Sequence, residues 1–224
     1  LTLTPANGIV LGDRAVGGIH SATFTLTRTG GPPGLSLSAA VSGAGFAFRD
    51  GSYPGTGGTC GGTLPATSCT VVTTLNPTTL GAWSGTLTVN AQDGVGSLTF
   101  SRPVALTAKN PAVLGSPDVL VSFANTAVGS FAEEIVILEN TGELPSSSIT
   151  GAIAGAGFSF AGGSYPGTGA TCGSSLQAGQ NCTVLLRFTP SSAQSFMGQL
   201  NIASHDGALA QSFSIPLRGD GVVS

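Results

Sequence analysis

Four cysteines are the residues of this chain whose chemistry says most about it. Cys60 and Cys69 form one close pair with eight residues between them, and Cys172 and Cys182 form a second pair with nine between them. Cysteines can bind zinc or form disulfides. A structural zinc site usually joins two short C-x2-4-C pairs, and the present intervals are longer. The spacing therefore favours disulfides, for which four cysteines allow three connectivities.

Residue types suited to catalysis are present, but their spacing argues against an active site. Ser204-His205-Asp206 has the composition of a hydrolase triad. Consecutive residues of a strand point to opposite faces, so these three cannot form the relay. The neighbours Glu133 and Glu134 diverge in the same way, and no carboxylate pair recurs at a spacing that suggests glycoside hydrolysis. We expect a protein that is not an enzyme and uses no cofactor.

Metal binding is also disfavoured by the pattern of acidic residues. Asp50, Asp93, Asp206 and Asp220 each precede a glycine, but none belongs to a D-x-D-x-D run. Such a run would supply the several oxygen ligands that calcium needs. Asp-Gly is instead a common turn dipeptide, because it tolerates positive φ angles. We expect turns at these positions and no metal site.

The elements that position these residues are duplicated along the chain. Residues 45–61 read GFAFRDGSYPGTGGTCG and residues 157–173 read GFSFAGGSYPGTGATCG, identical at 13 of 17 positions. The offset is 112 up to the cysteines and 113 after them, and the second value aligns Trp83 with Phe196 and Leu87 with Leu200. Duplication places one cysteine pair in each repeat, so we expect the bridges Cys60–Cys69 and Cys172–Cys182.

The local periodicity is that of β-strands. Thr23–Thr27, Gly85–Val89 and Gln211–Ile215 alternate between polar and apolar residues, which is typical of strands with one buried face. The runs at Ile135–Leu138 and 184–186 are more continuously apolar, as central strands can be. Asp93-Gly94 and Asp206-Gly207 lie between two such runs and predict turns.

These observations predict an all-β fold of two tandem immunoglobulin-like β-sandwich domains. Short strands with turn signals about every ten residues, in units of about 110, are typical of this sandwich. The chain of 224 residues divides near Lys109-Asn110-Pro111, which gives domains at residues 1–109 and 110–224. The antibody arrangement of two distant cysteines around a tryptophan is absent, so this is a different branch of the sandwich folds.

One set of motifs resembles a known family. The second repeat contains Gly163-Ser-Tyr-Pro-Gly-Thr-Gly, Thr171-Cys-Gly, Cys182-Thr-Val, Phe188-Thr-Pro and Phe196-x-Gly-x-Leu. This pattern resembles the choice-of-anchor D repeat, a bacterial member of the ASPM–SPD-2–Hydin (ASH) group of immunoglobulin-like domains. The resemblance implies repeats of large secreted or surface-anchored bacterial proteins, and the family has no catalytic residues to transfer. The first repeat departs from the pattern at residues 64–67, where Leu-Pro-Ala-Thr replaces the Leu-x-Ala-Gly turn.

The loops containing Tyr53-Pro54 and Tyr165-Pro166 are the best candidates for a specific binding site. Exposed tyrosines at loop tips could contact a glycan or a protein, because aromatic side chains make good anchors. In the structural alternative, each tyrosine packs on the edge of the sandwich while Pro-Gly forms a type II turn. We favour the structural interpretation, because both repeats keep the loop almost unchanged.

Composition narrows the partners and the compartment. The chain has only seven Lys and Arg residues and a net charge of −3, so it lacks the basic surface that binds nucleic acid. It also contains no stretch of 18 apolar residues, so no membrane span is predicted. Disulfides persist in oxidising compartments, so we expect a secreted or cell-surface protein. The chain has few lysines that could block pairing at the strand edges, so self-association through edge strands is a hypothesis.

The function that we expect is a non-catalytic structural module of a bacterial extracellular protein, such as a stalk, a spacer or a fibre or filament subunit. The alternative is an adhesin or ligand-binding module that recognises a surface glycan or protein through loops at one end of the sandwich.

Overall fold

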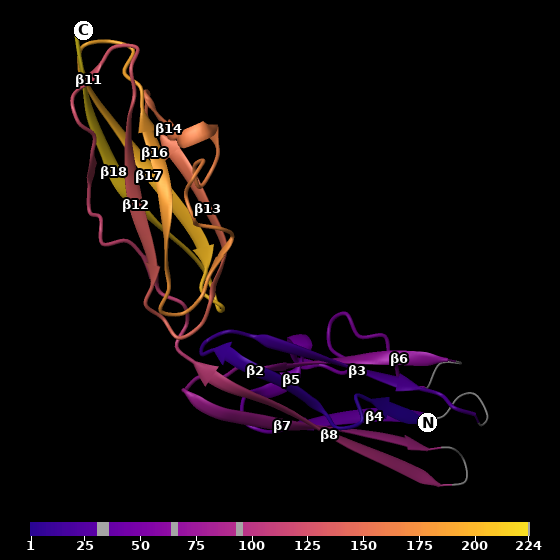
Figure 1. Ribbon diagram of the computed structural model, residues 1–224. Helices are drawn as coiled ribbons and strands as arrows, with labels where there is room; N and C mark the ends of the chain where they lie inside the picture. Colours follow the sequence, from indigo (N-terminus) through magenta and orange to yellow (C-terminus); the bar gives the residue numbers. More distant parts are fainter. Residues whose placement is uncertain (31–35, 64–66, 93–95, 224) are drawn as a thin grey trace. The chain divides into compact units, whose positions relative to one another are not determined.

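The computed structural model describes residues 1–30, 36–63, 67–92 and 96–223, and it consists of two compact units, Leu1–Lys109 and Asn110–Ser224 (Figure 1). The turn expected at Asp93-Gly94 and residues 64–66 of the divergent loop lie outside the described residues.

The first unit is built from two four-stranded sheets, with strand orders β1-β3-β6-β5 and β2-β8-β7-β4. Its strands are antiparallel except for the parallel pair β2 and β8. The elements are β1 (Thr2–Thr4), β2 (Ile9–Ala15), β3 (His20–Thr27), β4 (Ser36–Ser42), β5 (Phe46–Phe48), the 3-10 turn η1 (Arg49–Gly51), β6 (Ser68–Leu75), β7 (Gly81–Gln92) and β8 (Ser97–Lys109).

The second unit repeats this plan with the sheets β14-β16-β12-β9 and β10-β18-β17-β13-β15, where β11 also pairs with β18. Its elements are β9 (Leu114–Gly115), β10 (Val121–Ser122), β11 (Thr126–Ala127), β12 (Ala132–Asn140), β13 (Ser146–Ala154), β14 (Phe158–Phe160), the 3-10 turn η2 (Ala161–Gly163), β15 (Ser175–Leu176), β16 (Asn181–Phe188), β17 (Ser195–His205) and β18 (Ala210–Val222).

The alternation of side chains explains why each unit closes on itself. In β3, Phe24 and Leu26 are fully buried, while Thr23 and Thr25, which alternate with them, face outward. The matching residues of the second unit, Val136 and Leu138, are fully buried as well. Each unit thus has its own apolar core between two sheets, as a sandwich requires. The predicted all-β, immunoglobulin-like sandwich fold is confirmed.

One inner strand is paired on one side over only part of its length. The apolar run in β12 predicts a central strand, and β12 does lie between β16 and β9 in its sheet. It pairs with β16 along Ala132–Glu139, whereas β9 covers it only at Glu139 and Asn140. Ile135 and Ile137 lie on the outer face of this strand and are 61% and 40% exposed. The run at 184–186 also occupies an inner strand, because β16 is flanked by β14 and β12.

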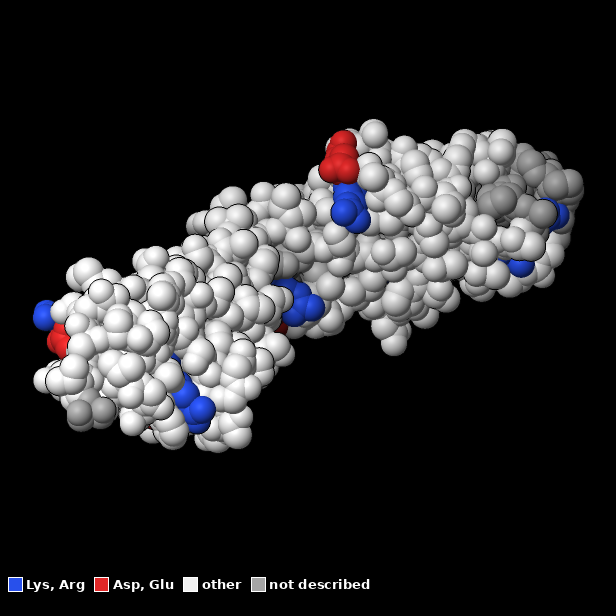
Figure 2. Space-filling model, turned by 90° about the horizontal axis from the view of Figure 1, so that it is seen from above, with Lys and Arg blue, Asp and Glu red and all other residues white. Residues whose placement is uncertain are grey.

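The molecular surface carries few charges, as the composition of 8% charged residues requires. Figure 2 shows a few basic and acidic groups, some of them side by side, on a face that is otherwise uncharged. Among the described residues, no helix is long and apolar enough to cross a membrane.

Candidate functional site

The loop with Tyr53-Pro54 and its counterpart with Tyr165-Pro166 are called the tyrosine loops. Each begins after a short strand and returns to the edge of the adjacent long strand. In the first unit it leaves β5 through η1, and the amide of Gly55 then donates to the carbonyl of Ser52. The loop lies against β6, because Val72 N donates to Pro54 O. In the second unit Gly167 N donates to Ser164 O, and Leu185 N donates to Pro166 O. The loop sequence repeated in the two units therefore gives the same backbone path in both.

The turn in this loop is not the predicted one. A type II turn would place Pro54 and Gly55 at its two central positions. The hydrogen bond from Gly55 to Ser52 instead places Tyr53 and Pro54 there, and the Tyr53–Pro54 peptide bond is cis. A cis proline at the third position of a turn defines type VI. The second unit also has a type VI turn in place of the predicted type II turn, because the Tyr165–Pro166 bond is cis as well.

Both tyrosines use their rings and hydroxyls inside the protein. Tyr53 packs edge-on against Phe48, with ring centroids 5.7 Å apart, and its hydroxyl donates to Gly61 O at 3.1 Å. Tyr165 packs against Phe160 in the same way, and its hydroxyl donates to the carbonyl of Gly173. Burial raises the pKa of both hydroxyls above the usual value of a tyrosine. These are the contacts of packed side chains.

Disulfides fix the end of each loop. The bonds Cys60–Cys69 and Cys172–Cys182 are both formed, with Cα–Cα distances of 4.8 Å. The partner cysteines lie on β6 and β16, at the second residue of each strand. Each bridge therefore attaches the loop to the strand that carries it, and the expected pairing of one bridge per repeat is confirmed.

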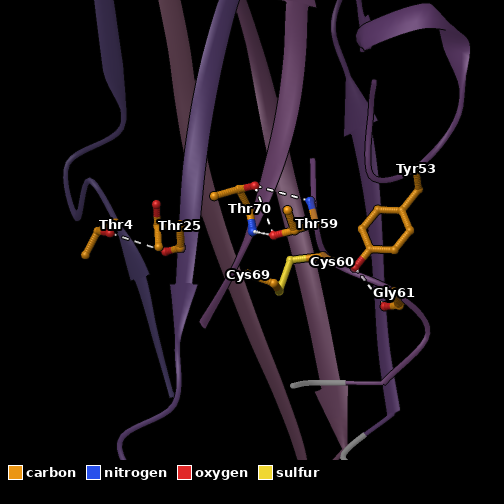
Figure 3. The surroundings of a disulfide bond; sticks show 8 residues. All are labelled: Thr4, Thr25, Tyr53, Thr59, Cys60, Gly61, Cys69 and Thr70. Carbon is orange, nitrogen blue, oxygen red and sulfur yellow. Dashed lines mark hydrogen bonds between the residues drawn. A yellow bond between two sulfur atoms is a disulfide. The ribbon is translucent and has the colours of Figure 1, made fainter. Parts of the chain in front are cut away.

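A pair of threonines next to each disulfide adds a second attachment (Figure 3). The hydroxyls of Thr59 and Thr70 lie 3.2 Å apart, and each accepts a hydrogen bond from the backbone amide of the other residue. Thr171 and Thr183 repeat the arrangement at 3.1 Å. Sequence reasoning missed these pairs. The signal was present, because a threonine precedes the first cysteine and follows the second in both repeats.

Close backbone approach explains one glycine of each loop. Gly55 and Gly167 have φ angles of +85° and +104°. A Cβ atom at Gly55 would collide with the carbonyl oxygen of Val72, and one at Gly167 would collide with that of Leu185. Only glycine allows both the positive φ and this contact. The Pro-Gly sequence is therefore a requirement of packing.

The residues of the suspected triad are engaged in a turn. The Asp206 carboxylate accepts hydrogen bonds from the amides of Ala208 and Leu209 and from the side chain of Gln211. His205 Nδ1 lies 3.1 Å from the amide of Gly207, which donates to it. Gly207 has a φ of +99°, which confirms the turn predicted at Asp206-Gly207. No relay from serine through histidine to aspartate is assembled.

Burial and hydrogen bonding act in opposite directions on Asp206. Burial would raise the pKa of this carboxyl group, but the hydrogen bonds from Leu209, Ala208 and Gln211 favour its charged form. Together with the charge interaction with His205, their effect exceeds that of burial, and the pKa lies below the usual value. The charged Asp206 therefore stabilises the turn between β17 and β18.

The remaining acidic residues do not converge. Across the described part of the chain, no group of three or more His, Cys, Asp or Glu residues could hold a metal ion. Glu133 forms an ion pair with Arg187 across two strands, at 2.7 Å. The sequence Arg218-Gly219-Asp220 is that of an integrin-recognition tripeptide. It lies within β18 and pairs with β17. It is held extended in a sheet and does not form a loop tip.

A buried asparagine is a further structural residue that sequence reasoning missed. Asn140 is 1% exposed, and its Nδ2 donates to the carbonyls of Leu144 and Leu176. Its Oδ1 accepts hydrogen bonds from the amides of Val113 and Gly142. The matching residue of the first repeat is Arg28, so comparison of the repeats gave no signal for this network.

Comparison with known proteins adds a set of distant likenesses. No family model matches the chain, and no curated protein matches it. A solved ASH/PapD-like domain of human CEP192 (PapD-like domain 7) is 14% identical with a TM-score of 0.38, covering 51% of this chain and 88% of that one. A protein of unknown function from Porphyromonas gingivalis W83 is 11% identical with a TM-score of 0.37, covering 98% of both chains.

A third solved structure contains fibronectin(III)-like modules of Clostridium thermocellum CbhA. It is 9% identical with a TM-score of 0.37, covering 98% of this chain and 94% of that one. Likenesses of this strength say nothing about function.

Proposed function

We propose that this chain is a non-catalytic structural module of a bacterial extracellular protein, a stalk, a spacer or a fibre subunit made of immunoglobulin-like domains of the choice-of-anchor D type. The observation that carries the proposal is the internal use of the only two tyrosines. Tyr53 and Tyr165 bond to carbonyls of their own loops and pack on Phe48 and Phe160. The loops that stand out in the sequence thus have a structural task in both copies.

Two disulfides suggest an oxidising, extracytoplasmic environment. A secreted or surface location and a bacterial source are part of the proposal. They are supported by the Tyr-Pro-Gly-Thr-Gly and cysteine motifs, which resemble the choice-of-anchor D repeat. The sparse charges leave few Lys and Arg residues at which trypsin-like proteases cut, which suits an exposed position outside the cell.

An array of bacterial and host-surface glycans, probed with the purified oxidised chain, tests this proposal. A structural module gives no saturable binding to any arrayed glycan. Saturable binding would contradict the proposal. Its loss in Tyr165→Ala, with retention in Tyr165→Phe, would assign adhesion to the loop, which is the alternative function. Tyr53→Ala provides the matched variant in the first unit.

A further inference from the structure

The outer faces of the two units have diverged in polarity at matching positions, whereas the buried Phe24 and Leu26 are matched by the buried Val136 and Leu138. On the sheet that carries the tyrosine loop, the outward residues of β3 include Ser21, Thr23 and Thr25. The matching residues of β12, displaced by 112, are Glu133, Ile135 and Ile137. The first unit therefore exposes hydroxyl groups where the second exposes isoleucines.

Beyond its short pairing with β9, the strand edge next to the isoleucines has no strand partner among the described residues. Along β12 the amide of Asn140 points to the β16 side, where it donates to Gln180 O, whereas the amide of Ile137 points away and donates to the Asp118 carboxylate. Successive amides of a strand alternate in direction, so Glu133 N–H and Ile135 N–H also point away from β16. Within the described residues these two amides have no hydrogen-bond partner.

Two other strands near the sheet edges offer much less apolar surface, whereas the outermost strand β2 exposes Val10. The outward residues of β4 are Ser38, Ala40 and Ser42, and those of β13 are small as well. Next to β12, Phe131 is 57% exposed and lies under the Arg187 guanidinium, 4.2 Å from its ring centroid. Glu133 is neutralised by the same Arg187. β12 contains no lysine and no proline, two of the residues that block pairing at an edge, and its charged residues are three glutamates.

We propose that β12 is an association site whose occupant is β12 of a second copy of this chain, paired antiparallel about a two-fold axis at Ile135. A free sheet edge is complementary to another extended strand with free amides and carbonyls, and the identical edge of a second copy provides one. This inference deepens the structural role proposed above and rests on it.

The open amides define the register. With Ile135 opposite Ile135 of the second copy, the two Ile135 residues exchange a pair of hydrogen bonds, and each Glu133 N–H reaches the carbonyl of Ile137 in the other copy. These bonds use the two free donors. The Asp118 carboxylate occupies the place that Glu133 of the other copy takes, so it leaves the Ile137 N–H, which then donates to the carbonyl of that Glu133. The Ile135 side chains then form a direct cross-strand pair, the arrangement in which β-branched residues stabilise a sheet.

Charge does not oppose this pairing at the outer face, because each Glu133 already carries its Arg187 partner. The Glu134 side chains project from the opposite face of β12. In this register each lies across from Val136 of the other copy, so the two carboxylates are not directly opposed. The interface is isologous, since the same residues act on both sides of the axis, and it closes as a dimer.

Sedimentation velocity of the intact chain, over about 10 μM to about 1 mM, tests the association, since a single strand pair gives a small and weak interface. We expect a monomer–dimer equilibrium. The double variant Ile135→Thr/Ile137→Thr gives these positions the threonines found at the matching positions 23 and 25 of the first unit. It should weaken dimerisation about tenfold or more. Met197→Thr, which changes a residue 80% exposed on β17, should leave it unchanged. A monomer at every concentration, or a dimer insensitive to the double variant, would overturn the proposal.

Hydrogen exchange of the unmodified protein gives a test that no folding defect can obscure. The amides of Glu133 and Ile135 should exchange more slowly as concentration rises, while those of Ser21 and Thr23 should not change. Ile135→Pro removes one of the free donors, and Thr23→Pro is its match in the first unit. Unchanged exchange at Glu133 and Ile135 in a dimer would place the interface elsewhere. If the chain does not dimerise, the proposed structural role still stands, with the chain as a monomeric spacer. The glycan array, in contrast, tests that structural role itself.

Discussion

The hydroxyl of Tyr165 donates a hydrogen bond to the carbonyl oxygen of Gly173, the residue that directly follows the disulfide-bonded Cys172. Tyr53 and Gly61 repeat this relationship beside Cys60. Tyrosine, turn and disulfide therefore act as one unit in each copy. The most conspicuous motif of the sequence is an attachment of the loop to the sandwich.

The disulfides should contribute measurably to stability. Each closes a loop of about ten residues, so replacing Cys172 and Cys182 with alanine should destabilise the second unit by about 2–3 kcal/mol. Denaturant unfolding followed by a probe in each unit measures this, and the first unit should be unaffected. Intact mass should rise by two hydrogens per bridge on reduction. Four free thiols in the protein as isolated would contradict this assignment.

The tyrosines should titrate abnormally at high pH. Burial raises the pKa of both Tyr53 and Tyr165 above 10.0. The folded chain holds these protons more tightly than the unfolded chain, so stability is retained below about pH 10 and falls as pH rises further. Tyrosinate absorbance reports only these two residues, because the chain has no other tyrosine. Identical titration curves for the folded and the denaturant-unfolded chain would show that the hydroxyls are not buried.

Asp206 should make the second unit sensitive to acid. The folded state lowers the pKa of this carboxyl group, so the unfolded chain binds the proton more readily, and stability falls as pH drops below about 5. Asp206→Asn should be less stable than the unmodified chain at neutral pH, and the difference should shrink in acid. Asp13→Asn, in the first unit, serves as the control. A difference that stays constant with pH would rule out this role for the carboxylate.

Gly167 should tolerate no side chain. A Cβ atom there would collide with Leu185 O, and the φ of +104° is unfavourable for other residues. Gly167→Ala should destabilise the second unit by about 2 kcal/mol or more, through strain and the displaced loop. Gly169→Ala is a useful comparison, because it has a similar φ of +92° but open space around its Cβ position. Equal effects of the two substitutions would show that the close contact with β16 is unimportant.

The sequence predicted what depends on local pattern and on duplication. Alternation located the strand around Phe24, and the repeated spacing paired Cys60 with Cys69. What it missed depends on tertiary neighbours. The turn at Pro54 is set by the pairing of the loop with β6. The exposure of Ile135 follows from its position on the outer face of β12, opposite the buried Val136, which a run of apolar residues cannot reveal.

The stability of Tyr165 variants, measured by denaturant unfolding of the second unit, tests the central claim most directly. Tyr165→Phe removes only the hydrogen bond to Gly173 and should cost about 0.5–1.5 kcal/mol. Tyr165→Ala also removes the ring packed on Phe160 and should cost about 2–4 kcal/mol. Both variants with the stability of the unmodified chain would contradict the account, because a tyrosine that contributes nothing to folding is free to serve recognition.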